Sequence, residues 1–240
     1  MTEHISRKEL KQDKVRETFE HGAEAVLSHT RILTVTLLVM VLGAAGYLGW
    51  RLYSQREAAQ SQMALDEAMK IYGAQLNVPG QPVLPGELTY SDASKRSEDA
   101  LAKFNVVAAK YPHTDAGRQA RYYAALSLMD LDRLNQATEE LKKLAGSSDK
   151  EMAALAQYQM ALIDERTGKT DEAIKLLRGL TTAGSVLVPK AMAQLELAGV
   201  LSQTDPKQAA DIYTELKVKY PNTPVADQAD RGLQLLASKS

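Results

Sequence analysis

Hydrophobic positions along the chain form two patterns, one continuous and one periodic. The continuous pattern is the uncharged run ILTVTLLVMVLGAAGYLGW at 32–50, bounded by Arg31 and Arg51. As a helix these nineteen residues extend about 28 Å, close to the ~30 Å hydrocarbon core of a bilayer. Tyr47 and Trp50 lie at its C-terminal end, where aromatic rings favour the headgroup layer. The run therefore predicts a transmembrane helix over 32–50.

We expect this segment to remain as an uncleaved anchor. The 31 residues before it are far longer than the n-region of a usual signal peptide. Basic residues are balanced on its two sides, but the short leading tail favours an N-terminus inside the cell and an exported main domain. Ala45 and Gly49 are small residues spaced four apart, which makes them a candidate docking site for another membrane helix.

The segments flanking the anchor are polar. In the N-terminal tail, 1–31, Ser6 and Glu9 fit a capping box and predict a short amphipathic helix. After the anchor, 51–76 is alanine-rich and predicts a polar helix. The following stretch, 77–94, contains several prolines and glycines, so we expect a loop there.

The periodic pattern occupies the rest of the chain. The segments 100–114 and 209–223 both read A-x3-[FY]-x5-K-Y-P-x-T and lie 109 residues apart, about three periods of 36. Ala137, Ala173 and Ala209 follow one another at that spacing of 36. A small residue at a fixed position lets two antiparallel helices approach closely, and stacked pairs build one continuous core. We therefore predict an all-α solenoid of helical hairpins over 95–240, with 225–237 as a C-terminal capping helix.

These residues resemble the tetratricopeptide repeat family. Ala161, Gly168, Ala173 and Leu177 match the small, small, alanine and large positions of one family repeat. The chain departs from the family in its period of 36 rather than 34 and in having no tryptophan to open a repeat. The resemblance covers about 97–224 and implies helical hairpins that bind other proteins.

The resemblance also implies a concave groove lined by the first helix of each pair. Methionine and tyrosine recur in this apolar lining, and both suit adaptable protein contacts. Such a groove could hold apolar segments of unfolded or emerging chains, or the helix at 51–76 or the cap could fill it from within. Transferring the family's groove positions to this chain gives eight residues: Tyr122, Leu126, Met129, Leu155, Tyr158, Leu162, Met192 and Leu195.

The sequence offers little that could carry chemistry. Its four histidines are scattered, it has no cysteine, and its acid pairs fall at helix starts where they complement the helix dipole. It contains no phosphate-binding loop and no nucleophile elbow. A net charge of −1 without basic clusters speaks against nucleic-acid binding. We expect no enzyme activity, no catalytic residues, no cofactor, no metal and no small-molecule substrate.

The order of tail, anchor, polar helix and repeat array resembles the YfgM-type family of ancillary SecYEG translocon subunits. That resemblance implies a bacterial inner-membrane protein with a cytoplasmic N-terminus and a periplasmic repeat domain. Its implied partners are translocon subunits, periplasmic chaperones, unfolded or exported clients and the lipid bilayer. The Lys-Tyr-Pro-x-Thr turns also resemble those of outer-membrane assembly lipoproteins and the TolA-binding envelope protein. Two alternatives stay open. One is a scaffold for another envelope complex, such as division machinery. The other is a receptor with a cytoplasmic array.

Overall fold

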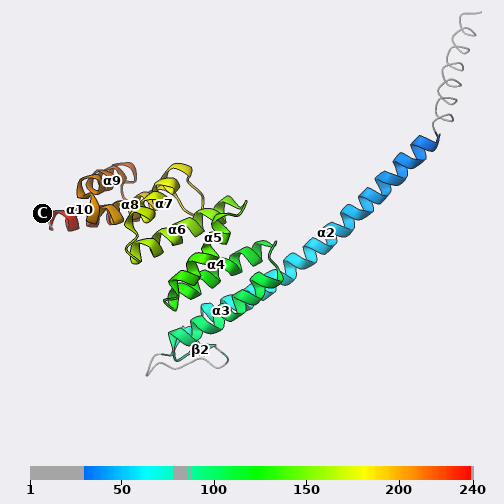
Figure 1. Ribbon diagram of the computed structural model, residues 1–240, viewed down its shortest axis with the longest axis horizontal. Coiled ribbons are helices and arrows are strands. Elements are labelled where there is room, and N and C mark those ends of the chain that lie inside the picture. The colour runs from blue at the N-terminus through cyan, green and yellow to red at the C-terminus, as the bar shows by residue number, and fades with distance from the viewer. Residues whose placement is uncertain (1–29, 78–85, 87, 239–240) are drawn as a thin grey trace, which may run out of the picture. The chain divides into compact units, whose positions relative to one another are not determined.

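The computed structural model describes residues 30–77, 86 and 88–238. The chain divides into two compact units, 1–56 and 57–240. The first unit is described only from Thr30, where helix α2 begins (Figure 1). The amphipathic helix expected in the N-terminal tail therefore lies outside the described residues.

Helix α2 is a single helix of 43 residues, Thr30–Tyr72. The part from Thr34 onward contains a window that is long and apolar enough to cross a membrane, and none of that window is buried. Side chains along it are largely exposed, including Leu42 at 63% and Trp50 at 65%. This is the membrane-span candidate among the described residues, and it agrees with the continuous apolar pattern.

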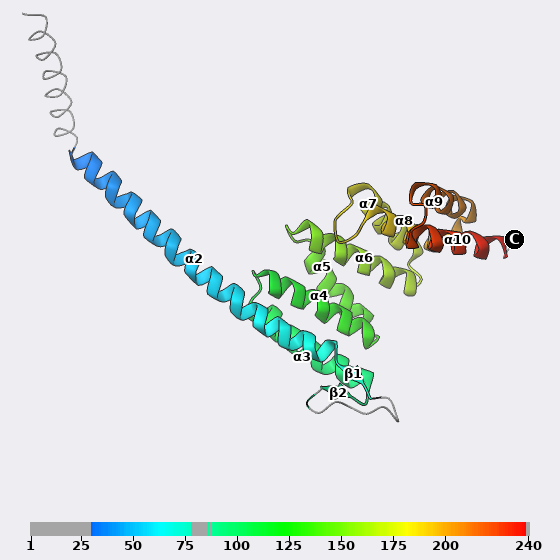
Figure 2. The same ribbon diagram turned by 180° about the vertical axis from the view of Figure 1, so that it is seen from behind.

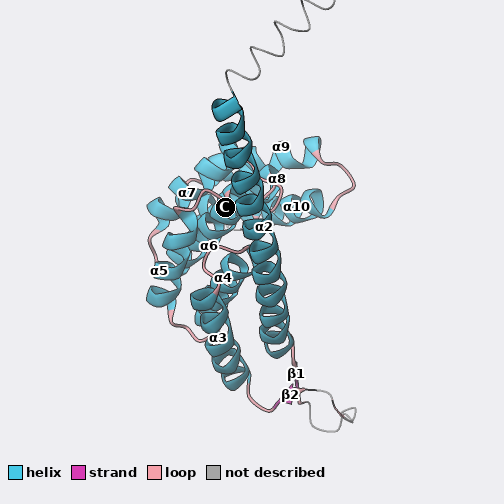
Figure 3. Ribbon diagram, turned by 90° about the vertical axis from the view of Figure 1, so that its right-hand side faces the viewer, coloured by secondary structure: helices cyan, strands magenta, loops and turns pink. Residues whose placement is uncertain are grey.

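The C-terminal end of α2 differs from the polar helix expected to reach residue 76. The helix ends at Tyr72; the Gly73 amide donates to the Met69 carbonyl at 2.9 Å, and a strand follows two residues later. Strand β1, Gln75–Leu76, pairs in parallel with strand β2, Thr89–Tyr90. Figure 3 shows this two-residue pairing in magenta beside the start of the next helix.

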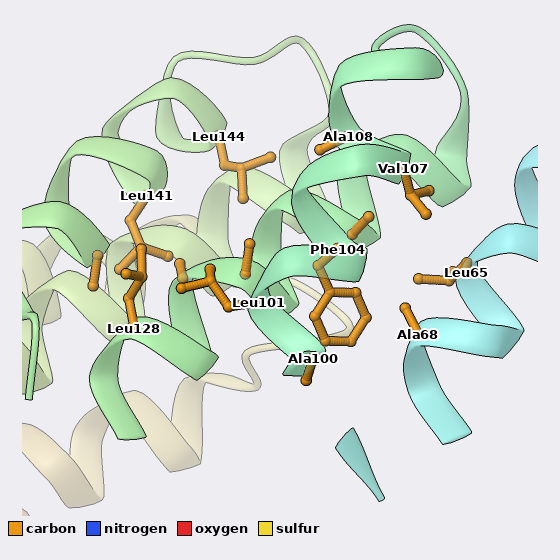
Figure 4. Packing of buried hydrophobic residues seen from close by; sticks show 14 of the residues in the cluster. Leu65, Ala68, Ala100, Leu101, Phe104, Val107, Ala108, Leu128, Leu141 and Leu144 are labelled. Carbon is orange, nitrogen blue, oxygen red and sulfur yellow. The ribbon is translucent and has the colours of Figure 1, made fainter. Parts of the chain in front are cut away.

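Helix α3, Ala93–Lys110, begins two residues before the end of the expected loop, capped by the Asp92 carboxylate. It packs against the last part of α2, where Leu65 and Ala68 are almost fully buried. Figure 4 shows both side chains pointing toward Phe104 of α3. The end of α2 thus serves as the first helix of the first pair, and helix pairing begins before residue 95.

The remaining helices form the solenoid of helical hairpins that the periodic pattern predicted (Figures 1 and 2). Neighbours in the chain pack on one another, and the last helix also contacts α8. The successive pairs are α4/α5, α6/α7 and α8/α9, with α10 at the end. The helices are α4 Asp115–Asp130, α5 Leu134–Ala145, α6 Lys150–Arg166, α7 Thr170–Ala183, α8 Lys190–Thr204, α9 Pro206–Lys219 and α10 Pro224–Ala237.

The repeated alanines form the close contacts between helices. All of them are 0% exposed, both in the second helices and in the helix preceding each one, and a large side chain one turn later fills the space beside them. Phe104, Leu141 and Leu177 take that second role and are also 0% exposed. The buried alanines of the second helices are Ala100, Ala137, Ala173 and Ala209.

The turn between the two helices of a pair explains why the alanine spacing within the third pair differs from that in the other two. In two pairs the turn contains a residue with positive φ, Asp132 at 57° and Gly168 at 78°. The next residue donates its amide back into the preceding helix, as Lys169 does to the Asp164 carbonyl at 2.7 Å. In the third pair, Asp205 alone separates α8 from α9 and Pro206 starts the new helix. This shorter turn accounts for the spacing of 11 residues between Ala198 and Ala209, against 12 between Ala161 and Ala173.

The Lys-Tyr-Pro-x-Thr turns connect one pair to the next through the threonine. The Thr114 hydroxyl accepts the Gly117 amide at 3.0 Å, which caps α4, and donates to the Tyr111 carbonyl at 3.0 Å. Thr223 makes the equivalent bonds before α10. The motif therefore marks the end of one helix and the N-cap of the following one.

Candidate partner-binding face

The eight residues expected to line a groove occupy equivalent places on the first helices α4, α6 and α8. Tyr122 and Tyr158 are 36 residues apart, as are Leu126 and Leu162. All eight side chains are half-buried, even with the end of α2 and the cap α10 in place. We call this set the A-helix face; its members are Tyr122, Leu126, Met129, Leu155, Tyr158, Leu162, Met192 and Leu195.

Members of the A-helix face differ in how closely they join the core. Tyr122, Met129 and Leu155 pack against the N-terminal apolar cluster, and Tyr158 and Leu195 pack against the C-terminal one. Leu126 and Leu162 lie outside the apolar clusters of the described residues. These two half-buried leucines are therefore the members that we choose for testing contact with another molecule.

Hydrogen bonds tie the three first helices together along this face. The Gln159 side-chain amide donates to the Tyr122 hydroxyl at 3.0 Å, which links α6 to α4. The Tyr158 hydroxyl donates to the Glu196 carboxylate at 3.1 Å, which links α6 to α8. Burial raises the pKa of both phenols, and the nearby Glu196 raises that of Tyr158 further. Both tyrosines are thus neutral donors or acceptors at neutral pH.

Two carboxylates accompany the apolar face, and the sequence did not single them out. Glu165 lies seven residues after Tyr158 on α6, a spacing that puts both on one side of a helix. Burial raises the pKa of Glu165, and the charge on Glu196 raises it further. The second carboxylate is Glu196 on α8. Packing of α6 near α8 brings Glu165 and Glu196 close together, which their separation of 31 residues in the sequence does not reveal.

An aromatic cluster holds the end of α2 onto the array. The Tyr72 ring lies 5.9 Å from Phe104 and 5.7 Å from Tyr123, and Tyr123 contacts Tyr122 of the A-helix face at 5.6 Å. Pairs at such distances add about 0.5–1.5 kcal/mol each beyond their buried area. Burial and the nearby Asp130 raise the pKa of Tyr72 to about 12, so its hydroxyl stays protonated. The cluster connects the end of α2 to the first part of the A-helix face.

The candidate membrane-docking residues Ala45 and Gly49 lie on the exposed part of α2. A Cβ atom built at Gly49 would meet nothing within 4 Å. Among the described residues of this unit, 30–56, nothing therefore lies against the helix at Gly49. Docking of another membrane helix there remains a prediction.

A cavity of about 200 Å³ lies at the C-terminal end of the array, between α8, α9 and α10. A Cβ at Gly232 would come within 2.5 Å of the Tyr213 ring, so only glycine lets α10 approach that ring. The cavity is lined by Gly199, Ser202, Gln203, Tyr213, Gly232, Leu235 and Leu236.

Among the described residues, no group of three or more His, Cys, Asp or Glu side chains could hold a metal ion.

Comparison with protein families assigns this fold to a class. A model described as a tetratricopeptide repeat-like domain matches residues 30–185, and a model of the tetratricopeptide repeat matches residues 191–223. The first match covers more than half of the chain, so the chain belongs to the tetratricopeptide repeat-like domain family. Its match begins at the start of α2, which agrees with the end of that helix acting as part of the array. Membership supports a role in protein interaction.

The chain is also similar to the ancillary SecYEG translocon subunit of Neisseria gonorrhoeae (strain ATCC 700825 / FA 1090). The two are 28% identical over 140 residues, which is 58% of this chain and 59% of that relative. The chain therefore matches less than two thirds of the relative's length. No solved structure matches the chain.

Proposed function

We propose that this protein is a membrane-anchored interaction module that serves as an accessory subunit of the protein-export translocon. The similarity to the ancillary SecYEG translocon subunit carries this proposal. The arrangement of the chain supports it, because one apolar helix leads into an array whose A-helix face is half-exposed and largely apolar. In this role the A-helix face binds chaperones or exported clients, and the protein has no catalytic function.

The proposed location is the bacterial inner membrane, with the N-terminal tail in the cytoplasm and the repeat array in the periplasm. The apolar helix and the similarity to the ancillary SecYEG translocon subunit support the membrane location. The absence of cysteine allows a direct test, because a single introduced thiol gives an unambiguous label. Cells that express either the Thr2→Cys or the Asn222→Cys variant are treated with a maleimide after their outer membrane is permeabilised. This maleimide cannot cross the inner membrane. Labelling of Asn222→Cys alone is expected; labelling of Thr2→Cys alone would overturn the orientation.

Association with the translocon is tested by copurification of the full chain from membranes. We expect translocon subunits in the eluate of the unmodified protein. Replacing Leu126 and Leu162 with glutamate should remove chaperones or clients, since charges on an apolar contact surface are costly to bury. Val218→Glu is the matched control, because Val218 is 78% exposed on second helix α9. Copurification of a different envelope complex without any translocon subunit would contradict the proposal and favour a scaffold role.

A further inference from the structure

Two acidic side chains, one on α6 and one on α8, accompany the A-helix face. Glu165 and Glu196 lie beside the apolar members of the face, and Glu196 is held in place by the Tyr158 hydroxyl at 3.1 Å. Glu165 shares its side of α6 with Tyr158 and Leu162. The two carboxylates are close enough for the charge of Glu196 to raise the pKa of Glu165. The face therefore combines an apolar surface with a localised negative charge.

The chain supplies no cation to these two carboxylates within the part that the structure describes. Elsewhere in the array half-exposed acidic side chains have basic partners: Arg118 lies 3.2 Å from Asp149, and Lys143 lies 2.7 Å from Glu140. No such ion pair joins Glu165 or Glu196 among the described residues. Burial and the charge of Glu196 both disfavour the charged form of Glu165, and a cation brought by another molecule would offset both effects.

We propose that the A-helix face receives a segment of a partner protein that carries a lysine or arginine among apolar side chains, with the cation beside Glu165 and Glu196. This inference rests on the proposed function and names the chemistry of the partner. The apolar side chains of the segment contact Leu126 and Leu162, the two members of the face outside the core clusters. The cation sits next to the carboxylates, where the half-buried site screens it less than open solvent would. An acidic segment is repelled, so the same pair supplies specificity.

Peptide binding to the full chain in detergent tests this inference. The probes are three fluorescently labelled short peptides of leucine, alanine and serine that differ only at the central position, which is arginine, glutamine or glutamate. We expect the arginine peptide to bind about tenfold more tightly than the glutamine peptide, because an ion pair at a half-buried interface contributes more than an exposed one. The glutamate peptide should bind weakest.

Variants of the protein locate the charge effect. Glu165→Gln, which keeps the Tyr158–Glu196 hydrogen bond, should reduce the advantage of the arginine peptide, and adding Glu196→Gln should abolish it. Glu215→Gln is the control, because Glu215 is exposed on second helix α9. Circular dichroism should show unchanged helix content in all three variants, since the replacements are isosteric.

Two results overturn the inference and leave the proposed function standing. The first is equal affinity for the arginine and glutamine peptides. The second is an arginine advantage that survives in the Glu165→Gln, Glu196→Gln protein. Failure of all three peptides to bind would overturn both the inference and the role of the A-helix face in binding clients.

Discussion

Leu65→Ala tests whether the end of α2 is an integral part of the repeat array. Leu65 is 2% exposed and contacts the cluster that contains Phe104 and Val107 of α3. Truncating a buried leucine costs about 2–5 kcal/mol, through lost transfer energy and the cavity left behind. We expect about 3 kcal/mol, because α2 covers this end of the array from one side only.

The effect should be local, because each pair in a repeat array contacts only its neighbours. Hydrogen exchange of the full chain in detergent measures it residue by residue. About 3 kcal/mol corresponds to a fall of roughly 100-fold in amide protection across α3, since 1.4 kcal/mol is a factor of ten. Amides of α9 should keep their protection.

Met63→Ala is the matched control on the same helix. Met63 is 69% exposed and lies two residues from Leu65, so its truncation should leave α3 protection within a few-fold of the unmodified chain. Equal effects of the two substitutions, or an unchanged α3 in Leu65→Ala, would refute the packing of α2 on the array.

Three further predictions concern local features of the array. Gly117→Ala should lower the melting temperature, since the new methyl group would overlap the Tyr111 carbonyl oxygen, whereas Gly179→Ala has open space and should add about 0.5–1 kcal/mol; calorimetry that ranks them the other way would contradict this. Thr114→Ala should cost about 1 kcal/mol by removing the cap of α4, measured as faster hydrogen exchange in its first turn; unchanged exchange would count against the cap. Glu165→Gln should raise the melting temperature at neutral pH, because the raised pKa of Glu165 makes its charged form destabilising. The gain should vanish below about pH 4, where the carboxyl is protonated in both the folded and the unfolded chain. A gain that does not depend on pH would exclude this cause.

The periodic part of the fold could be predicted from the sequence because its spacing is regular. Ala137 and Ala173 stand 36 residues apart, and a fixed period implies a repeated helical pair. The turn at Asp132 was harder, since an aspartate rarely signals the left-handed backbone that Gly168 adopts at the equivalent place. The alanine periodicity nevertheless indicated the helical pairs that the structure shows as α4 to α9.

The role of the end of α2 could not be predicted in the same way. Ala68 on α2 and Ala100 on α3 are 32 residues apart, against 12 for Ala125 and Ala137, because strands β1 and β2 and their connection intervene. That insertion hides the first pair from a search for constant spacing. The charge pair of the candidate site was hidden for a different reason, since Glu165 and Glu196 come together only when α6 packs near α8.

The proposed function requires the A-helix face to be where this protein meets its partners at the membrane. The most direct test places a photo-crosslinking amino acid at Leu162 in the full chain in cells and identifies the products by mass spectrometry. Val218, exposed on α9, is the control position. We expect crosslinks from position 162 to translocon subunits, chaperones or exported proteins, and few from position 218. Absence of products at 162, or the same products from both positions, would contradict it.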